Sequence, residues 1–117
     1  MFPIWEHKLR AILGNIVSVN GPFMKMVGRE HLEKFRGSHS HIRSQLDAWV
    51  CEVEDAQWQS PQDIQKRFPH ASFLTKNRVI FNLKGNKYRL EAKVSFKNQV
   101  VLIKRIGTHA EYSRWKL

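Results

Sequence analysis

The feature that most constrains the fold is a strict alternation of polar and apolar residues from position 87 to position 96. Even positions are apolar and odd positions are polar: Tyr88, Leu90, Ala92, Val94 and Phe96 against Lys87, Arg89, Glu91, Lys93 and Ser95. A repeat of two residues places the two sets on opposite faces of a β-strand. The segment therefore predicts a strand with one buried face and one charged face.

Segment 78–83 continues the alternation, and a two-residue loop at Gly85-Asn86 would join the two strands as a hairpin. The predicted pairs are Leu83–Tyr88, Phe81–Leu90, Val79–Ala92, Asn82–Arg89 and Arg78–Lys93. Apolar residues then face apolar residues throughout. A slip by one residue would mix the two faces, so the register is well determined.

A second hairpin is predicted around a three-residue loop at 97–99, which completes a three-stranded antiparallel meander. The expected pairs are Phe96–Val100, Val94–Leu102 and Glu91–Arg105, with His109 close to Lys87 and Arg89. This register leaves Lys104 on the apolar face. It gives the other face a set of cations, Lys87, Arg89, Lys93 and Arg105, with a histidine at its edge.

The segments before the meander read as a short strand and then helices. A strand is expected at about 24–28, a brief helix before Gly37, an amphipathic helix over 40–56 and another over 60–68. Residues 1–23 read as an N-terminal extension, either a small helix or an upstream stretch of the reading frame, and 24–117 as one domain. The order of elements predicts an α+β fold, with the strand and helices packed on the meander and a short C-terminal turn.

The positive charge is confined to the second half of the chain. Residues 1–60 hold seven basic and seven acidic residues, whereas residues 61–117 hold thirteen basic and three acidic ones. Such a one-sided basic surface suits a polyanion, with RNA or DNA as the leading partner. An acidic protein partner and an idle basic surface remain alternatives.

Other chemistries find little support in the sequence. The single cysteine, Cys51, excludes an internal disulfide and suits a reducing cytoplasm. His39-Ser40-His41 has no Cys or carboxylate at ligand spacing, so a solvated helix start is favoured over a metal site. No cofactor motif is present, and no apolar run approaches the length of a membrane span.

The cationic face ends in His109, Glu111 and Tyr112. Metal-independent RNA cleavage requires a base for the 2′-hydroxyl, an acid for the departing 5′-oxygen and cations around the phosphorus. Histidine can transfer protons near neutral pH, and Arg89 can grip a phosphate with two parallel hydrogen bonds. Taken alone, these residues favour nucleic-acid binding over catalysis.

Residues 71–112 also resemble the HigB toxins, messenger-RNA interferases of the RelE/ParE toxin superfamily. Three motifs carry the resemblance, in the family's order: Asn-Arg-Val-Ile-Phe-Asn at 77–82, Gly-Asn-Lys-Tyr-Arg-Leu at 85–90 and Gly-Thr-His-Ala-Glu-Tyr at 107–112. The helical segments match in layout, so the likeness extends from about Met24 to Tyr112. It implies a RelE-like fold and a metal-independent endoribonuclease that cuts messenger RNA in the ribosomal A site.

The resemblance also implies roles for individual residues. Arg89 resembles the family's phosphate-binding arginine. His109 and Tyr112 resemble the residues that orient or protonate the scissile phosphate. Lys87 is a weaker catalytic assignment. The expected RNA-binding residues are Arg78 and Asn82, which the resemblance implies, and Lys93 and Arg105, which lie on the predicted cationic face.

The expected partners are messenger RNA, the ribosome and a helix-turn-helix antitoxin. The protein is expected to contact operator DNA only through this antitoxin. No membrane partner and no cofactor are expected, and the expected location is the cytoplasm. Two alternatives remain: a non-catalytic RNA-binding or ribosome-binding module that blocks translation, and a gyrase-directed toxin of the same fold.

Overall fold

The computed structural model describes residues 24–117, so the predicted N-terminal extension over 1–23 lies outside the described residues. The elements are β1 (Lys25–Val27), α2 (Arg29–Ser38), the 3₁₀ turn η2 (Ser40–Ile42), α3 (Arg43–Asp55), α4 (Pro61–Arg67), β2 (Ser72–Phe73), β3 (Arg78–Leu83), β4 (Tyr88–Ser95), β5 (Val100–Thr108) and α5 (His109–Tyr112). The first predicted helix continues through Gly37 to Ser38, and the second divides into η2 and α3.

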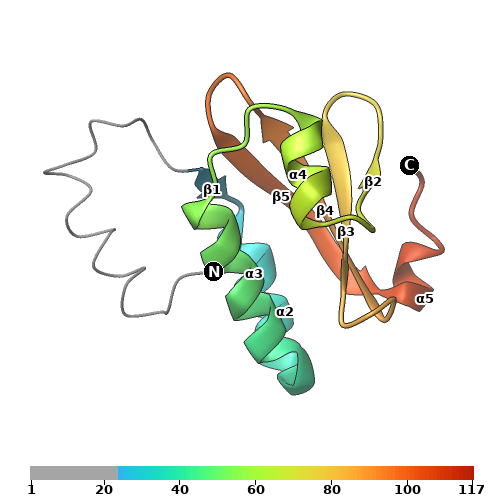
Figure 1. The fold of residues 1–117 in the computed structure, drawn as a ribbon. Coiled ribbons are helices and arrows are strands. Elements are labelled where there is room, and N and C mark those ends of the chain that lie inside the picture. Colours follow the sequence, from blue (N-terminus) through green and yellow to red (C-terminus); the bar gives the residue numbers. More distant parts are fainter. Residues whose placement is uncertain (1–23) are drawn as a thin grey trace, which may run out of the picture.

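The described strands form one five-stranded sheet in the order β1-β5-β4-β3-β2. The predicted meander is its centre, because β3, β4 and β5 pair antiparallel in sequence. β1 adds to one edge parallel to β5, and the two-residue β2 adds to the other edge antiparallel to β3. Figure 1 shows α2, α3 and α4 gathered to one side of the sheet and α5 at the end of β5. The predicted α+β fold, with the strand and helices packed on the meander and a short turn after its last strand, is confirmed.

The apolar set of the alternating segment faces these helices. Leu90 and Ala92 are fully buried, as is Phe81 on the neighbouring strand. The ring of Phe81 lies 5.2 Å from that of Trp49 on α3 and 5.1 Å from that of Phe68 after α4, centre to centre. Burial of this apolar face, at about 25 cal/mol per Å², holds the sheet against the helices.

The first hairpin has the predicted register in all five pairs, from Leu83–Tyr88 to Arg78–Lys93. The backbone at Lys84 and Gly85 turns through positive φ angles of 49° and 67°. Glycine adopts such angles at no steric cost, which accounts for Gly85 in this turn.

The second hairpin differs from the prediction near its turn. Val100 pairs with Ser95 instead of Phe96, and Val94 pairs with Val101 instead of Leu102. A β-bulge between Glu91 and Ala92 then absorbs one extra residue of β5 and restores the predicted Glu91–Arg105 pair. As a result Lys104 is exposed instead of lying on the apolar face, which explains why the bulge is favoured.

The turn itself is fixed by a distant contact. The side chain of Gln99 is buried, and its Nε2 donates to the carbonyl oxygens of Trp58 at 2.6 Å and Phe96 at 2.8 Å. Gln99 also adopts a φ of 55°. These contacts hold residues 96–99 as a four-residue connection where a three-residue loop was expected.

Candidate functional site

The short helix α5 is held at the end of β5 by a reciprocal cap. The hydroxyl of Thr108 accepts a hydrogen bond from the backbone N–H of Glu111 at 3.2 Å, and the Glu111 carboxylate accepts one from the N–H of Thr108 at 2.8 Å. These bonds satisfy N–H groups that a helix start otherwise leaves open. The backbone hydrogen bond from Thr108 is also the main cause that lowers the pKa of Glu111 below its ordinary value.

Because of this cap, His109 and Tyr112 lie beside the start of β4. The backbone N–H of His109 donates to the carbonyl oxygen of Lys87 at 2.8 Å. The centre of the His109 ring lies 6.4 Å from the centre of the Tyr112 ring. The guanidinium carbon of Arg89 lies 5.0 Å from the centre of the Tyr112 ring. We call these four residues, Lys87, Arg89, His109 and Tyr112, the sheet-end cluster. They are the four residues predicted as catalytic.

Arg89 is the most buried member of the cluster, at 9% exposed. Its Nη1 donates to the carbonyl oxygen of Asn86 at 2.6 Å, which fixes the guanidinium over the ring of Tyr112. No ion pair within residues 24–117 involves Arg89. A preorganised guanidinium with uncompensated charge is suited to bind a phosphate.

Two histidines that the sequence did not assign to the site lie close to Tyr88, the residue before Arg89. The ring of His39 stacks on Phe35 at 3.8 Å with an interplanar angle of 7°, and it meets Tyr88 edge-on at 6.0 Å. The His41 ring lies 6.5 Å from the same tyrosine. The spacing of four residues between Phe35 and His39 is the sequence signal that indicates this stack.

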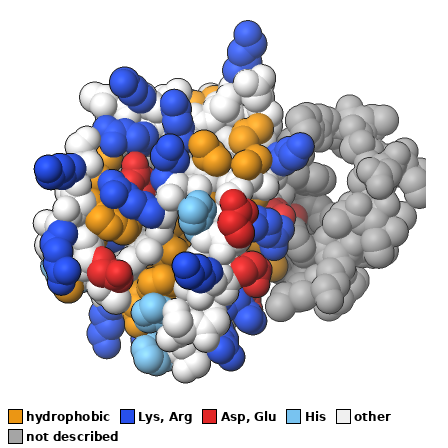
Figure 2. Space-filling view, turned by 180° about the vertical axis from the view of Figure 1, so that it is seen from behind, with side chains coloured by type: hydrophobic (Ala, Val, Ile, Leu, Met, Phe, Trp, Pro, Cys, Tyr) orange, Lys and Arg blue, Asp and Glu red, His pale blue; other side chains and the backbone are white. Residues whose placement is uncertain are grey.

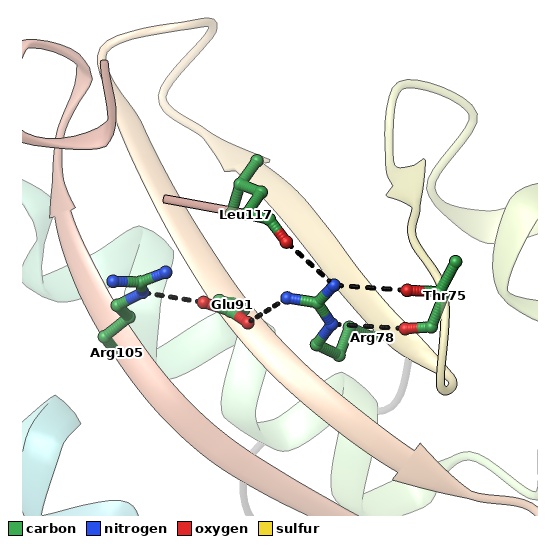
Figure 3. A network of polar contacts seen from close by, with 5 residues as sticks. All are labelled: Thr75, Arg78, Glu91, Arg105 and Leu117. Atoms are coloured by element: carbon green, nitrogen blue, oxygen red, sulfur yellow. Dashed lines mark hydrogen bonds and ion pairs between the residues drawn. The ribbon is translucent and has the colours of Figure 1, made fainter. Parts of the chain in front are cut away.

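The remaining predicted cations lie farther along the same face, around Glu91. This carboxylate is 4% exposed and accepts from the Nε of Arg105 at 2.7 Å, while the Nη1 of Arg78 lies 3.7 Å away. Arg78 also donates to the hydroxyl and carbonyl oxygens of Thr75 and to the carbonyl oxygen of Leu117, as Figure 3 shows. Glu91 therefore balances part of the charge of both arginines.

A series of stacked side chains connects this network to the sheet-end cluster. From Arg89 and Tyr112 it continues to Trp115, whose ring lies edge-on to Tyr112 at 5.5 Å. The guanidinium carbon of Arg105 lies 4.4 Å from the Trp115 ring. Gly107 lies beneath this ring, and a Cβ there would be 3.0 Å from the ring, which would have to move by a few tenths of an ångström. Trp115 thus packs over the sheet and holds the C-terminal segment on its charged face.

The predicted site residues therefore form two groups instead of one continuous surface. Arg78, Lys93 and Arg105 line an open depression of about 750 Å³, to which Lys76 and Lys104 also contribute. Lys93 lies four positions along β4 from Arg89, a distance of about 13 Å. Figure 2, seen from behind Figure 1, shows Lys and Arg side chains over much of this side of the molecule.

Asn82, the last of the predicted RNA-binding residues, lies opposite Arg89 on β3. Its Nδ2 donates to the carbonyl oxygen of His70 at 3.2 Å and to the Oδ1 of Asn86 at 3.4 Å. It therefore belongs to the cluster end of the sheet and not to the depression.

Two features apply to the described part of the chain as a whole. Within residues 24–117, no three His, Cys, Asp or Glu side chains gather closely enough to hold a metal ion. Over the same residues, no helix is both long and apolar enough to cross a membrane.

The fold and the sheet-end cluster together define a small basic α+β domain with an arginine, a lysine, a histidine and a tyrosine at one end of its sheet.

A family model described as the HigB toxin, the RelE-like toxic component of a toxin–antitoxin system, matches residues 42–115. The match spans more than half of the chain, which therefore belongs to the HigB toxin family. A search of curated proteins found no match. As the toxic component of such a system, the protein has an antitoxin as partner.

Proposed function

We propose that this toxin is a metal-independent endoribonuclease that cuts messenger RNA during translation on the ribosome. The observation that carries the proposal is the sheet-end cluster. There, Arg89 and Tyr112 stack at 5.0 Å, and the backbone of His109 is bonded to Lys87 at 2.8 Å. A phosphate-binding guanidinium and a proton-transfer group thus share one end of the sheet.

Each member of the cluster has a role in this reaction. Arg89 binds the scissile phosphate, with its Nη1 fixed by Asn86 and its other donors directed to phosphate oxygens. Lys87, which is exposed, adds a positive charge against the pentacoordinate phosphorus. His109 transfers a proton to or from the reacting oxygens, and the phenol of Tyr112 orients the phosphate.

The cations around Glu91 bind RNA but take no part in the cleavage step. Arg78, Lys93 and Arg105, with Asn82 nearer the cluster, bind the RNA backbone on either side of the cut. The ribosome supplies the messenger, and a helix-turn-helix antitoxin neutralises the toxin and connects it to operator DNA. We place this activity in the cytoplasm and assign it no cofactor.

The test is single-turnover cleavage of messenger on programmed ribosomes, with affinity measured separately. His109→Gln should keep most of the binding and reduce cleavage by about 10²–10⁴-fold, the usual contribution of a positioned acid or base. His31→Gln, an exposed histidine on α2, is the matched control and should cut at the wild-type rate. If His109→Gln also cuts at that rate, the proton-transfer role of His109 is wrong.

The wild-type protein separates the alternatives. New 5′ ends within messengers after brief induction support the nuclease. Stalled ribosomes with intact messengers would support a translation block by occupancy, and DNA damage would support a gyrase poison. Either of the last two results overturns the proposal.

A further inference from the structure

Trp115 has no role in the chemistry proposed above, although it contacts both groups of site residues. Its ring meets that of Tyr112 edge-on, with 5.5 Å between the ring centres, and the guanidinium carbon of Arg105 lies 4.4 Å from the centre of the Trp115 ring. The indole is partly buried and lies on the backbone of β5 at Gly107, where no side chain separates the two. Trp115 therefore joins one residue of the sheet-end cluster to one residue of the depression.

The ring of Tyr112 depends on few neighbours for its position. α5 has only four residues, and Tyr112 is the last of them. Within residues 24–117 its ring contacts two other aromatic rings, that of His109, tilted and 6.4 Å away, and the closer ring of Trp115. The backbone N–H of Trp115 also donates to the carbonyl oxygen of Tyr112 at 3.0 Å, so the chain turns back after α5 and the indole lies beside the phenol. Trp115 is thus the main aromatic support of Tyr112.

The indole is in turn held by a fixed cation. The Nε of Arg105 donates at 2.7 Å to the buried carboxylate of Glu91, as Figure 3 shows. This bond limits the movement of the guanidinium that lies over the Trp115 ring, and a cation over an indole attracts it. The buried carboxylate therefore fixes Arg105, and Arg105 fixes the indole.

The position of Tyr112 affects phosphate binding because its ring lies 5.0 Å from the guanidinium carbon of Arg89. The carbonyl oxygen of Asn86 holds one nitrogen of this guanidinium, and the contact with the tyrosine ring restricts the rest. Misplacing a catalytic group by about 1 Å can slow a reaction by about 10²-fold. A residue that holds Tyr112 in place thus affects the rate without touching the RNA.

We propose that Trp115 is a positioning residue of the cleavage site, which holds the ring of Tyr112 over Arg89. The inference rests on the proposed function for its reaction, but phosphate binding by Arg89 can be measured without cleavage. The contact requires an aromatic ring, edge-on to the phenol. Phenylalanine should therefore replace tryptophan at position 115, whereas leucine, which is apolar but not aromatic, should not.

The binding step is tested by nuclear magnetic resonance on the full chain, with inorganic phosphate as the probe and the Nε–H signal of Arg89 as the reporter. Trp115→Leu should weaken phosphate binding at Arg89 by about threefold or more, because a less preorganised guanidinium binds less tightly. Trp115→Phe should bind phosphate with nearly the affinity of the wild type. Equal affinities in the wild type and Trp115→Leu overturn the proposal, and so does an equal loss in the two variants.

The catalytic step is tested by single-turnover cleavage of messenger on programmed ribosomes, with affinity for the ribosome measured separately. Trp115→Leu should slow cleavage at saturation by about 10–10²-fold and change the affinity by less than about twofold. Trp115→Phe should recover most of the rate. Phe73→Leu removes an exposed aromatic ring from the edge strand β2 and is the matched control, which should cut at the wild-type rate.

Circular dichroism shows which variants are folded, and Trp115→Met, a second apolar variant without a ring, takes the place of Trp115→Leu if leucine prevents folding. A folded variant of this kind that cuts at the wild-type rate, or that loses affinity alone, overturns the proposal. A wild-type protein that binds phosphate through Arg89 but does not cut refutes the nuclease instead. Weaker phosphate binding in Trp115→Leu still supports the positioning role in that case.

Discussion

The guanidinium of Arg89 lies over the ring of Tyr112, with its central carbon 5.0 Å from the ring centre. The two residues come from different elements, β4 and α5, so the contact connects the start of the central strand to the last helix. Tyr112 also meets the ring of Trp115 edge-on, with 5.5 Å between the ring centres. The tyrosine therefore positions the arginine independently of any role for its hydroxyl group.

Tyr112→Phe and Tyr112→Ala should separate these two roles. The phenylalanine keeps both ring contacts, so the free energy of unfolding should change by less than about 0.5 kcal/mol. The alanine loses the contacts with Arg89 and Trp115 and should destabilise the protein by about 1–2 kcal/mol. Chemical denaturation of the two variants and the wild type measures this difference.

Cleavage by the same variants tests the role of the hydroxyl group. If the phenol orients the phosphate, as proposed, Tyr112→Phe should lose less activity than His109→Gln. An equal loss would identify Tyr112 as the proton donor and contradict the orienting role.

The alternation at 87–96 was enough to predict much of this arrangement. It gave the first hairpin in full, and with it the position of Asn82 opposite Arg89. It also gave the Glu91–Arg105 pair and brought His109 beside Lys87. The first hairpin depends on local periodicity and turn length, which a sequence displays directly. The other two pairs agree with the prediction because the bulge offsets the longer second turn.

Features that depend on distant contacts were not predictable in the same way. The second turn is fixed by Gln99 through the carbonyl oxygen of Trp58, far away in the sequence, and a bulge then moves Lys104 to the exposed side. The parallel pairing of β1 with β5, the edge strand β2 and the position of His39 near Tyr88 also arise from tertiary packing. No periodicity within a single segment contains this information.

The cap of α5 predicts a dependence of stability on pH. The hydrogen bond from Thr108 lowers the pKa of Glu111 below its ordinary value of 4.5. A lowered pKa in the folded state means that the ionised carboxylate contributes stability above about pH 4.5, and that this contribution is lost as the pH falls through the folded pKa. Glu111→Gln should therefore be less stable than the wild type at pH 7, and the difference should disappear in acid.

Denaturation curves of the two proteins from pH 7 to pH 3 measure this effect. Glu33→Gln, at an exposed position on α2, serves as the control. Thr108→Ala removes the other half of the cap and should cost about 0.5–2 kcal/mol at pH 7. If Glu111→Gln is less stable than the wild type by the same amount from pH 7 to pH 3, the cap does not depend on the charge of the carboxylate.

Glu91 should be important for stability because it is buried between two arginines. Its removal in Glu91→Ala leaves Arg78 and Arg105 without their carboxylate partner, at a cost of about 1.5–3 kcal/mol. Arg29→Ala breaks an exposed pair with Glu54, and should cost at most about 1 kcal/mol. Urea denaturation compares the two variants. Equal small losses would show that the Glu91 network does not stabilise the sheet.

The charge on the sheet predicts how binding responds to salt. Each phosphate contact to single-stranded RNA contributes about −0.7 to the slope of log K against log salt concentration. Arg89→Ala should weaken binding to single-stranded RNA and reduce the magnitude of this slope by roughly one contact. Lys34→Ala, an exposed cation on α2, should leave the slope unchanged. An affinity that is independent of salt in the wild type would show that this face does not bind nucleic acid. An equal change of slope in both variants would mean that Arg89 acts through net charge alone and does not hold a particular phosphate.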